Sequence, residues 1–207
     1  MLVIMTEPSP NLAVAIRLFD AANASDPNLD EGRPKELLYA ERMTAMLSRF
    51  APEADEVAQL AVRAQHIRRW VVPRDSYPQT REGYLMWRKG LYNFHAEEAA
   101  RLMRMAEYDE ITIDRVMQAI GKKAIKANPD TQLLEDVSAL VFIEHYLAAF
   151  VATKPDYDEA KWLDIVRKTW KKMSVMAHEF ALGGNSGGKL ILPPVLVPLI
   201  TKAVGET

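Results

Sequence analysis

Helical hydrophobic spacing, in which apolar residues recur three or four positions apart, runs through most of the chain between clusters of turn residues. No stretch alternates apolar and polar residues over a useful strand length, and the chain has no internal repeat. The pattern predicts about seven helices, over residues 12–22, 34–50, 52–70, 84–105, 112–126, 129–150 and 157–182. The predicted fold class is therefore all-α, a single helical bundle.

The most apolar of these stretches is LLEDVSALVFIEHYLAAF, residues 133–150, which we expect at the centre of the bundle. The loop VVPRDSYPQTREG, residues 71–83, contains two prolines and is flanked by aromatic residues that need burial, so it should be ordered. We expect one domain, residues 1–207, in which the glycine-rich loop and proline-punctuated tail at 183–207 pack on the bundle.

The composition of the chain restricts the chemistry available to it. The chain has 207 residues, 49% of them hydrophobic, which is enough to build the core of one domain. It has no cysteine, so disulfides, thiolate zinc sites and cysteine nucleophiles are excluded, and any metal must be bound by His, Asp or Glu. The net charge of −2 is not that of a general polyanion binder. We expect no nicotinamide, flavin or haem cofactor.

Neither end of the chain reads as a membrane or export signal. The first ten residues, MLVIMTEPSP, have no basic segment, and their apolar run stops after five positions. The longest apolar stretch near the C-terminus, Leu190 to Ile200, is too short to span a bilayer and contains three prolines. We therefore expect a cytoplasmic protein that does not insert into membranes.

Two histidines and one aspartate are polar residues on otherwise apolar helical stretches. His66 lies in RAQHIRRW, His95 in FHAEEAARLM and Asp136 in LLEDVSALVF, on three different predicted helices. Burying the Asp136 carboxylate costs free energy unless it is paired, hydrogen-bonded or bound to a metal. One interpretation is that the three side chains share a cavity and bind one divalent metal ion. The other is that the histidines are satisfied core residues and Asp136 binds a neighbouring arginine.

The segment from Arg63 to Lys89 is basic, whereas the rest of the chain is acidic. It contains seven cations and two carboxylates, interleaved with tryptophans and tyrosines. Guanidinium groups suit phosphate, and aromatic rings suit a base or sugar. The predicted phosphate-binding residues are Arg69, Arg74, Arg81, Arg88, Lys122 and Lys123. The alternatives are that these arginines pair with acids and hold the long loop, and that the lysines complement a helix dipole.

The spacing G-x-x-x-x-G-K at Gly183–Lys189 matches a phosphate-binding loop only superficially. Leu190 follows where a Ser or Thr should bind magnesium, and the preceding stretch is helical, whereas the motif needs a strand. We interpret the same residues as a glycine helix stop followed by a flexible loop.

Six motifs together resemble the uncharacterised domain-of-unknown-function family 4202 over nearly the whole chain. They are RAQHIRRW, PRDSYP, GYLMWR, FHAEEA, LEDVSALVF and RKTWKKMS. More distantly, the layout resembles the HD-domain metal-dependent phosphohydrolases, which are all-helical. That second resemblance implies an HD-like fold and places His66, His95 and Asp136 as metal ligands. The chain departs from the HD pattern at Ile67, which replaces the Asp of the His-Asp pair, and at Tyr39, which replaces the first histidine.

Three functions follow as expectations. The first is a metal-assisted phosphohydrolase that acts on a nucleotide or small phosphorylated metabolite, using one divalent ion to polarise phosphate. The second is a non-catalytic module that binds a phosphorylated ligand or, as a weaker alternative, RNA, with lysines in place of a metal. The third is a protein-interaction scaffold. The sequence names no catalytic residue.

Overall fold

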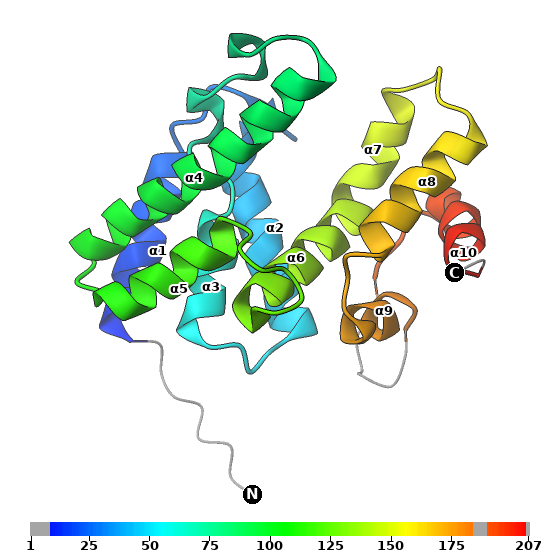
Figure 1. Ribbon diagram of the computed structural model, residues 1–207. Helices are drawn as coiled ribbons and strands as arrows, with labels where there is room; N and C mark the ends of the chain where they lie inside the picture. Colours follow the sequence, from blue (N-terminus) through cyan, green and yellow to red (C-terminus); the bar gives the residue numbers. More distant parts are fainter. Residues whose placement is uncertain (1–8, 184–189, 206–207) are drawn as a thin grey trace, which may run out of the picture.

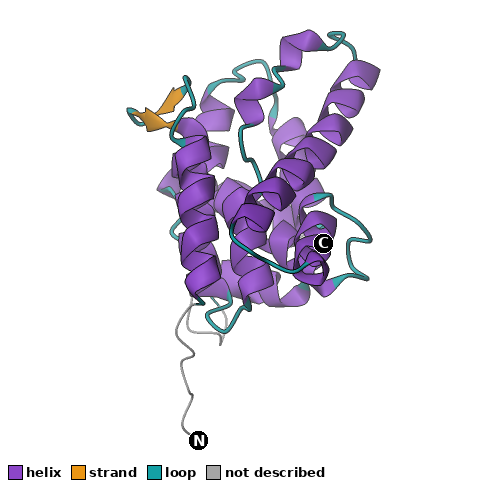
Figure 2. Cartoon of the chain, turned by 90° about the vertical axis from the view of Figure 1, so that its left-hand side faces the viewer, coloured by secondary structure: helices purple, strands orange, loops and turns teal. Residues whose placement is uncertain are grey.

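The computed structural model describes residues 9–183 and 190–205, and this part of the chain is all-α as predicted. Its α-helices are α1 (Pro10–Asn23), α2 (Lys35–Phe50), α3 (Glu56–Ala64), α4 (Arg81–Met105), α5 (Glu110–Ile120), α6 (Pro129–Val141), α7 (Leu147–Ala152), α8 (Glu159–Trp170), α9 (Val175–Ala181) and α10 (Val197–Gly205). Short 3₁₀ turns η1 (Arg69–Val71), η2 (Arg74–Ser76) and η4 (Pro194–Leu196) join some of them. A two-residue hairpin, β1 (Leu29–Asp30) and β2 (Arg33–Pro34), projects at one end of the bundle (Figure 2).

The predicted count of about seven helices is wrong, because two of the predicted helices are interrupted and the tail adds another. The last predicted helix is divided into α8 and α9, since Ser174 adopts an extended backbone and caps α9. The central helix changes from α6 to a π-helical turn, η3 (Phe142–Tyr146), before it continues as α7. Such turns follow from a local change in backbone hydrogen bonding, which hydrophobic spacing does not reveal.

Several helix starts also differ from the predicted ones. α3 begins at Glu56, after the extended N-cap Asp55, and not at Pro52. α5 begins at Glu110, because the N-cap residue is Asp109 and not Thr112. In both cases an aspartate accepts a backbone N–H that the first helical turn leaves without a partner.

The helices form a body on one side and a smaller group on the other, joined by α6 and η3. In Figure 1, α1, α3, α4 and α5 lie in the body, whereas α7 to α10 lie opposite α4. One connected core runs through the molecule, with fully buried side chains such as Phe19, Met43, Leu60, Met103 and Leu140. None of the helices in the described ranges combines the length and apolarity needed to cross a bilayer.

The described part of the tail, residues 190–205, packs on the other helices. Leu190, Leu196 and Ile200 are buried, and α10 lies against α8. The buried Glu144 of η3 accepts a hydrogen bond from the Ile191 backbone at 2.7 Å. Most of the G-x-x-x-x-G-K segment, residues 184–189, lies outside the described residues. Gly183 itself is described and has a φ of +75°, as expected of a glycine that ends a helix.

Burial distinguishes two ion pairs of the same two-pronged geometry. Arg63 contacts both carboxylate oxygens of Asp20 at 2.7 Å, and its side chain is 10% exposed. Arg104 contacts Glu110 in the same way, but the two side chains are 51% and 69% exposed. We expect Asp20→Asn to lower the free energy of unfolding by about 3 kcal/mol, because it leaves a buried guanidinium without its counter-charge.

Glu110→Gln is the matched control and should cost less than about 1 kcal/mol, because water screens the exposed pair. Urea denaturation of both variants measures the difference. Equal losses in the two variants would show that burial does not determine the contribution of these pairs.

Candidate functional site: a cationic cleft lined by aromatic residues

A cleft of about 870 Å³ lies between α4 on one side and α7 and α8 on the other, with α2 and α6 at its base. Its volume falls in the range of small-molecule binding sites. The first turn of α2, η1, α4, α6, η3, α7 and α8 all contribute side chains to it. Residues as far apart in the sequence as Lys35 and Lys172 therefore meet at this site.

Aromatic rings form much of the cleft wall. They belong to Tyr39, His66, Tyr84, Tyr92, Phe142, Tyr146 and Phe150. The π-helical turn η3 supplies two of them, Phe142 and Tyr146, four positions apart at the junction of the body and the smaller group. π-helical turns occur frequently at functional sites, where they change the direction in which side chains point.

Three cations in the cleft have no carboxylate partner within ion-pair distance among the described residues: Lys35, Arg69 and Arg88. The Arg69 guanidinium lies 4.9 Å from the centre of the Trp87 ring. Arg88 donates to the Tyr92 hydroxyl at 2.6 Å and lies over the ring of Tyr84. Contacts with rings and a hydroxyl orient these guanidinium groups without neutralising them.

The remaining charges of the cleft are largely paired. Glu135 of α6 contacts Lys122 and lies 3.6 Å from Lys172. These two lysines hold the pKa of Glu135 below its ordinary value, although burial alone would raise it. Arg69, Arg88 and Lys35 therefore give the cleft its excess positive charge.

Glu36 and His66 form the polar base of the cleft. Glu36 Oε2 lies 3.4 Å from His66 Nδ1, and the imidazole stacks on the Tyr39 ring with centres 4.2 Å apart. The Tyr39 hydroxyl donates to Gln65 at 2.7 Å, and the Gln65 amide donates to Ser138 at 3.1 Å. The stacked ring and the hydrogen bonds from Tyr39 fix the position of His66.

Burial changes the protonation of this pair. It raises the pKa of Glu36 to about 7, even though Arg69 and Lys35 favour the ionised carboxylate. Burial and the nearby Arg69 hold the pKa of His66 well below its ordinary value. Near neutral pH a protonated Glu36 can therefore donate to a neutral His66, and the carboxyl titrates in the range useful for proton transfer.

His95 lies directly behind His66, with ring centres 5.8 Å apart. Its Nδ1 lies 2.8 Å from the Ile67 carbonyl oxygen, which can only accept, so Nδ1 carries the hydrogen and donates. Burial and then the nearby His66 lower the pKa of His95 to about 3, so the ring is neutral. Its Nε2 is buried and has no hydrogen-bond partner among the residues that the structure describes.

The structure brings together two of the three residues predicted to bind a metal. His66 and His95 are neighbours, but Asp136 does not line the cleft. Its carboxylate accepts hydrogen bonds from the Gln132 amide at 2.9 Å and from the Ser174 backbone at 2.8 Å. These partners differ from the neighbouring arginine that the alternative interpretation predicted. Across residues 9–183 and 190–205, no three His, Asp or Glu side chains form a group that could hold a metal ion. These residues do not fit a shared three-ligand metal site, and a divalent ion remains a prediction from the HD resemblance.

The six predicted phosphate-binding residues separate into different places. Arg69 and Arg88 line the cleft, and Lys122 reaches its edge by pairing with Glu135. Arg74 instead donates to the carbonyl oxygens of Tyr77, Pro78 and Thr80, so it clamps the loop before α4. Arg81 is exposed at the first position of α4 and does not line the cleft.

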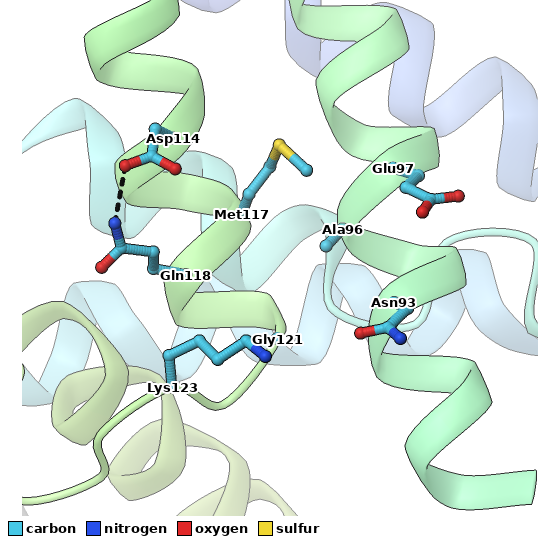
Figure 3. A pocket seen from close by; sticks show the side chains of 8 residues that line it. All are labelled: Asn93, Ala96, Glu97, Asp114, Met117, Gln118, Gly121 and Lys123. Carbon is cyan, nitrogen blue, oxygen red and sulfur yellow. Dashed lines mark hydrogen bonds between the residues drawn. The ribbon is translucent and has the colours of Figure 1, made fainter.

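Lys123 lines a separate, smaller pocket of about 180 Å³ between α4 and α5 (Figure 3). This pocket also contains Glu97 and Asp114, and Asp114 accepts from Gln118 at 2.6 Å. Its mixed charges and small volume distinguish it from the cationic cleft.

The cleft contains functional candidates that sequence patterns did not indicate. They are Lys35, Glu36, Tyr92 and Lys172. Glu36 lies in KELLYAERM, where its spacing resembles that of an ordinary first-turn glutamate of a helix. Only the tertiary structure reveals that this carboxyl is buried.

Fold and site together define an all-helical protein with one cationic, aromatic-lined cleft. The chain belongs to the family described as Domain of unknown function (DUF4202), whose model matches residues 13–190. The matched range includes every helix that lines the cleft and excludes α10. Neither a curated protein nor a solved structure matches the chain significantly. The HD-like fold is therefore not confirmed.

The raised pKa of Glu36 predicts a pH-dependent stability. Between about pH 4.5 and about pH 7, the folded protein holds a proton on Glu36 that the unfolded chain has lost, so stability falls as the pH rises through this range. Glu36→Gln cannot ionise. We expect it to be more stable than the natural protein at pH 8, by up to about 3 kcal/mol, and no more stable at pH 4.5.

Glu135→Gln is the control, because the pKa of Glu135 is shifted in the opposite direction. This variant should be less stable than the natural protein at pH 8, and the difference should shrink as the pH falls. Urea denaturation at both pH values gives the two free energies. A Glu36→Gln variant that is equally destabilised at both pH values would contradict the assigned pKa.

Proposed function

We propose that the protein binds a small phosphorylated ligand, a nucleotide or a phosphorylated metabolite, in the cleft between α4 and α8. The observation that carries the proposal is the set of cations Lys35, Arg69 and Arg88, which face one cleft without carboxylate partners among the described residues. Positive charges held close together in a protein repel one another, and an anion relieves that repulsion. Phosphate is the anion that the two guanidinium groups suit best.

The walls of the cleft favour a ligand with a flat or apolar part. The rings of Tyr84, Tyr92, Phe142 and Phe150 line the same space as the cations. Bases and sugars stack on such rings, and a volume of about 870 Å³ accommodates a nucleotide-sized molecule. Inorganic phosphate alone would leave most of this surface without contacts.

The first test uses Arg69→Gln combined with Arg88→Gln. This variant should lose the thermal stabilisation that phosphate and nucleoside monophosphates give the natural protein, because ligand binding stabilises only the folded state. Each lost charge-assisted contact is worth about 1.5–3 kcal/mol, or about ten- to a hundredfold in Kd. Isothermal titration calorimetry measures the affinities.

Arg74 and Arg81 offer two controls within the same basic segment. Arg81→Gln removes one exposed cation outside the cleft and should leave phosphate affinity within about twofold, a difference well under 1 kcal/mol. Arg74→Gln should lower the melting temperature through the loop without changing phosphate affinity. The proposal is excluded if phosphate and nucleotides do not shift the melting temperature of the natural protein, or if Arg81→Gln weakens binding as much as the cleft variant.

Hydrolysis of the bound phosphoester is a second candidate, and the Glu36–His66 pair favours it. A buried carboxyl with a pKa of about 7 at the base of a nucleotide-sized cleft can donate a proton to a leaving oxygen near neutral pH. The metal-assisted form of this reaction rests on the HD resemblance alone.

Glu36→Gln separates hydrolysis from binding. The variant keeps the shape of the side chain and a hydrogen-bond donor, so we expect nucleotide affinity within about threefold of the natural protein, which is well under 1 kcal/mol. Release of inorganic phosphate from a panel of nucleoside phosphates should fall by about 10²–10⁴-fold if the carboxyl is the general acid. Undiminished release by the variant, or no release by the natural protein, would leave binding as the function.

A further inference from the structure

A basic groove of about 700 Å³ continues from the cleft along α8. It shares Tyr84, Arg88, Thr169 and Lys172 with the cleft, so the two spaces are joined at these side chains. Beyond them the groove runs between the α5–α6 connection, which contributes Ile125 and Lys126, and the end of α8. The junction lies at Arg88, which belongs to both spaces.

Cations dominate the lining of this groove, and its described lining residues include no carboxylate. The cations are Arg88, Lys126, Lys168, Lys171 and Lys172. Lys168 pairs with Asp164, and Lys172 lies 3.6 Å from Glu135. Lys126 and Lys171 have no carboxylate within ion-pair distance in the described part of the chain. Lys126 donates to the Lys171 carbonyl oxygen at 3.2 Å, which holds it at the end of α8.

The backbone that presents Lys126 adopts a costly conformation. Lys122, Ala124 and Lys126 all have φ between +51° and +74°, a region that residues other than glycine adopt rarely. Such strain is retained where surrounding contacts fix it, and it occurs often at ligand sites. Here it directs Lys122 to Glu135 at the cleft edge and Lys126 into the adjoining groove.

We infer that the groove is a second anion subsite, and that the ligand carries a chain of at least two phosphate groups extending from the cleft past Arg88 toward Lys126 and Lys171. This inference rests on the proposed function, because it assumes that one phosphate lies near Arg69 in the cleft. Arg69 lines the cleft and not the groove, whereas Lys126 and Lys171 line the groove and not the cleft. A phosphate chain on a small molecule fits better than a nucleic-acid strand, because the basic lining is limited to one cleft and one groove on a chain of net charge −2.

Inorganic phosphate and inorganic tripolyphosphate test the inference without a choice of base. Calorimetric titrations compare the natural protein with Lys126→Glu/Lys171→Glu. We expect the natural protein to bind tripolyphosphate at least about tenfold more tightly than phosphate, and the variant to lose about tenfold or more in tripolyphosphate affinity, the effect of one or more lost charge-assisted contacts. Phosphate affinity should change by less than about threefold in the variant, since the cleft is intact.

Lys89→Glu/Lys154→Glu is the matched control, with the same change of charge at two exposed lysines outside both spaces. It should leave tripolyphosphate affinity within about threefold of that of the natural protein, which separates local contacts from general repulsion. Melting curves without ligand check that both variants fold.

Three results would overturn the inference. If phosphate binds but the groove variant and the control weaken tripolyphosphate equally, the second subsite is wrong and the proposed function stands. If neither anion binds the natural protein, the proposed function fails and the inference with it. If a single-stranded ribo-oligonucleotide binds through Lys126 and Lys171 while tripolyphosphate does not, the groove serves nucleic acid instead.

Discussion

Buried carboxylates on the central helix must find partners, and this requirement determines how the rest of the molecule is arranged around it. Glu135 pairs with Lys122 and Lys172, which brings the α5–α6 connection and the end of α8 together. Asp136 accepts from the Ser174 backbone and thereby fixes the start of α9. Glu144 pairs with Arg49 and accepts from the Ile191 backbone, which ties α2 and the tail to η3. An unpartnered charge at any of these positions would cost several kcal/mol, about the margin by which a domain of this size is stable.

Glu36 is buried like these three carboxylates, but its nearest charged neighbours do not form an ion pair with it. Arg69 and Lys35 lower its pKa only partly against the effect of burial, and its closest polar contact is His66. Glu135, by contrast, has a direct lysine partner. Within the described residues, the cleft thus contains one buried carboxyl and three cations that no direct ion pair joins, and His66 beside the carboxyl stacks on Tyr39. Titratable groups with perturbed pKa values in a cleft are common at functional sites.

The basic segment shows how one sequence feature can serve two roles. Arg63, Arg68 and Arg74 each use their guanidinium groups within the fold, on Asp20, Glu98 and loop carbonyls respectively. Arg69 and Arg88 do not, because η1 and the inner face of α4 turn them toward aromatic rings in the cleft. The local excess of positive charge therefore marked a segment that supplies two cations to the cleft, whereas its other paired arginines stabilise the fold. Spacing alone does not separate these roles, since Arg68 and Arg69 are adjacent.

Hydrophobic spacing determined the fold class and placed every main helix of residues 10–170, because burial of one helical face is a local property of the sequence. The same pattern indicated the central helix. Prolines and flanking aromatic residues predicted the ordered loop before α4, and the local charge excess pointed to two of the cations that line the cleft. The tertiary structure alone decided which residues form the site. Asp136, which was predicted to bind a metal, does not line the cleft, and its carboxylate accepts a hydrogen bond from the Ser174 backbone. Glu36, which the sequence shows only as a first-turn glutamate of a helix, lies at the base of the cleft. The break at Ser174 involves a long-range contact, the hydrogen bond from its backbone to Asp136, and the π-helical turn η3 involves a change in backbone hydrogen bonding that residue spacing does not encode. A side chain's partners, burial and protonation depend on segments that are distant in the sequence, and residue spacing along one helix contains no information about them.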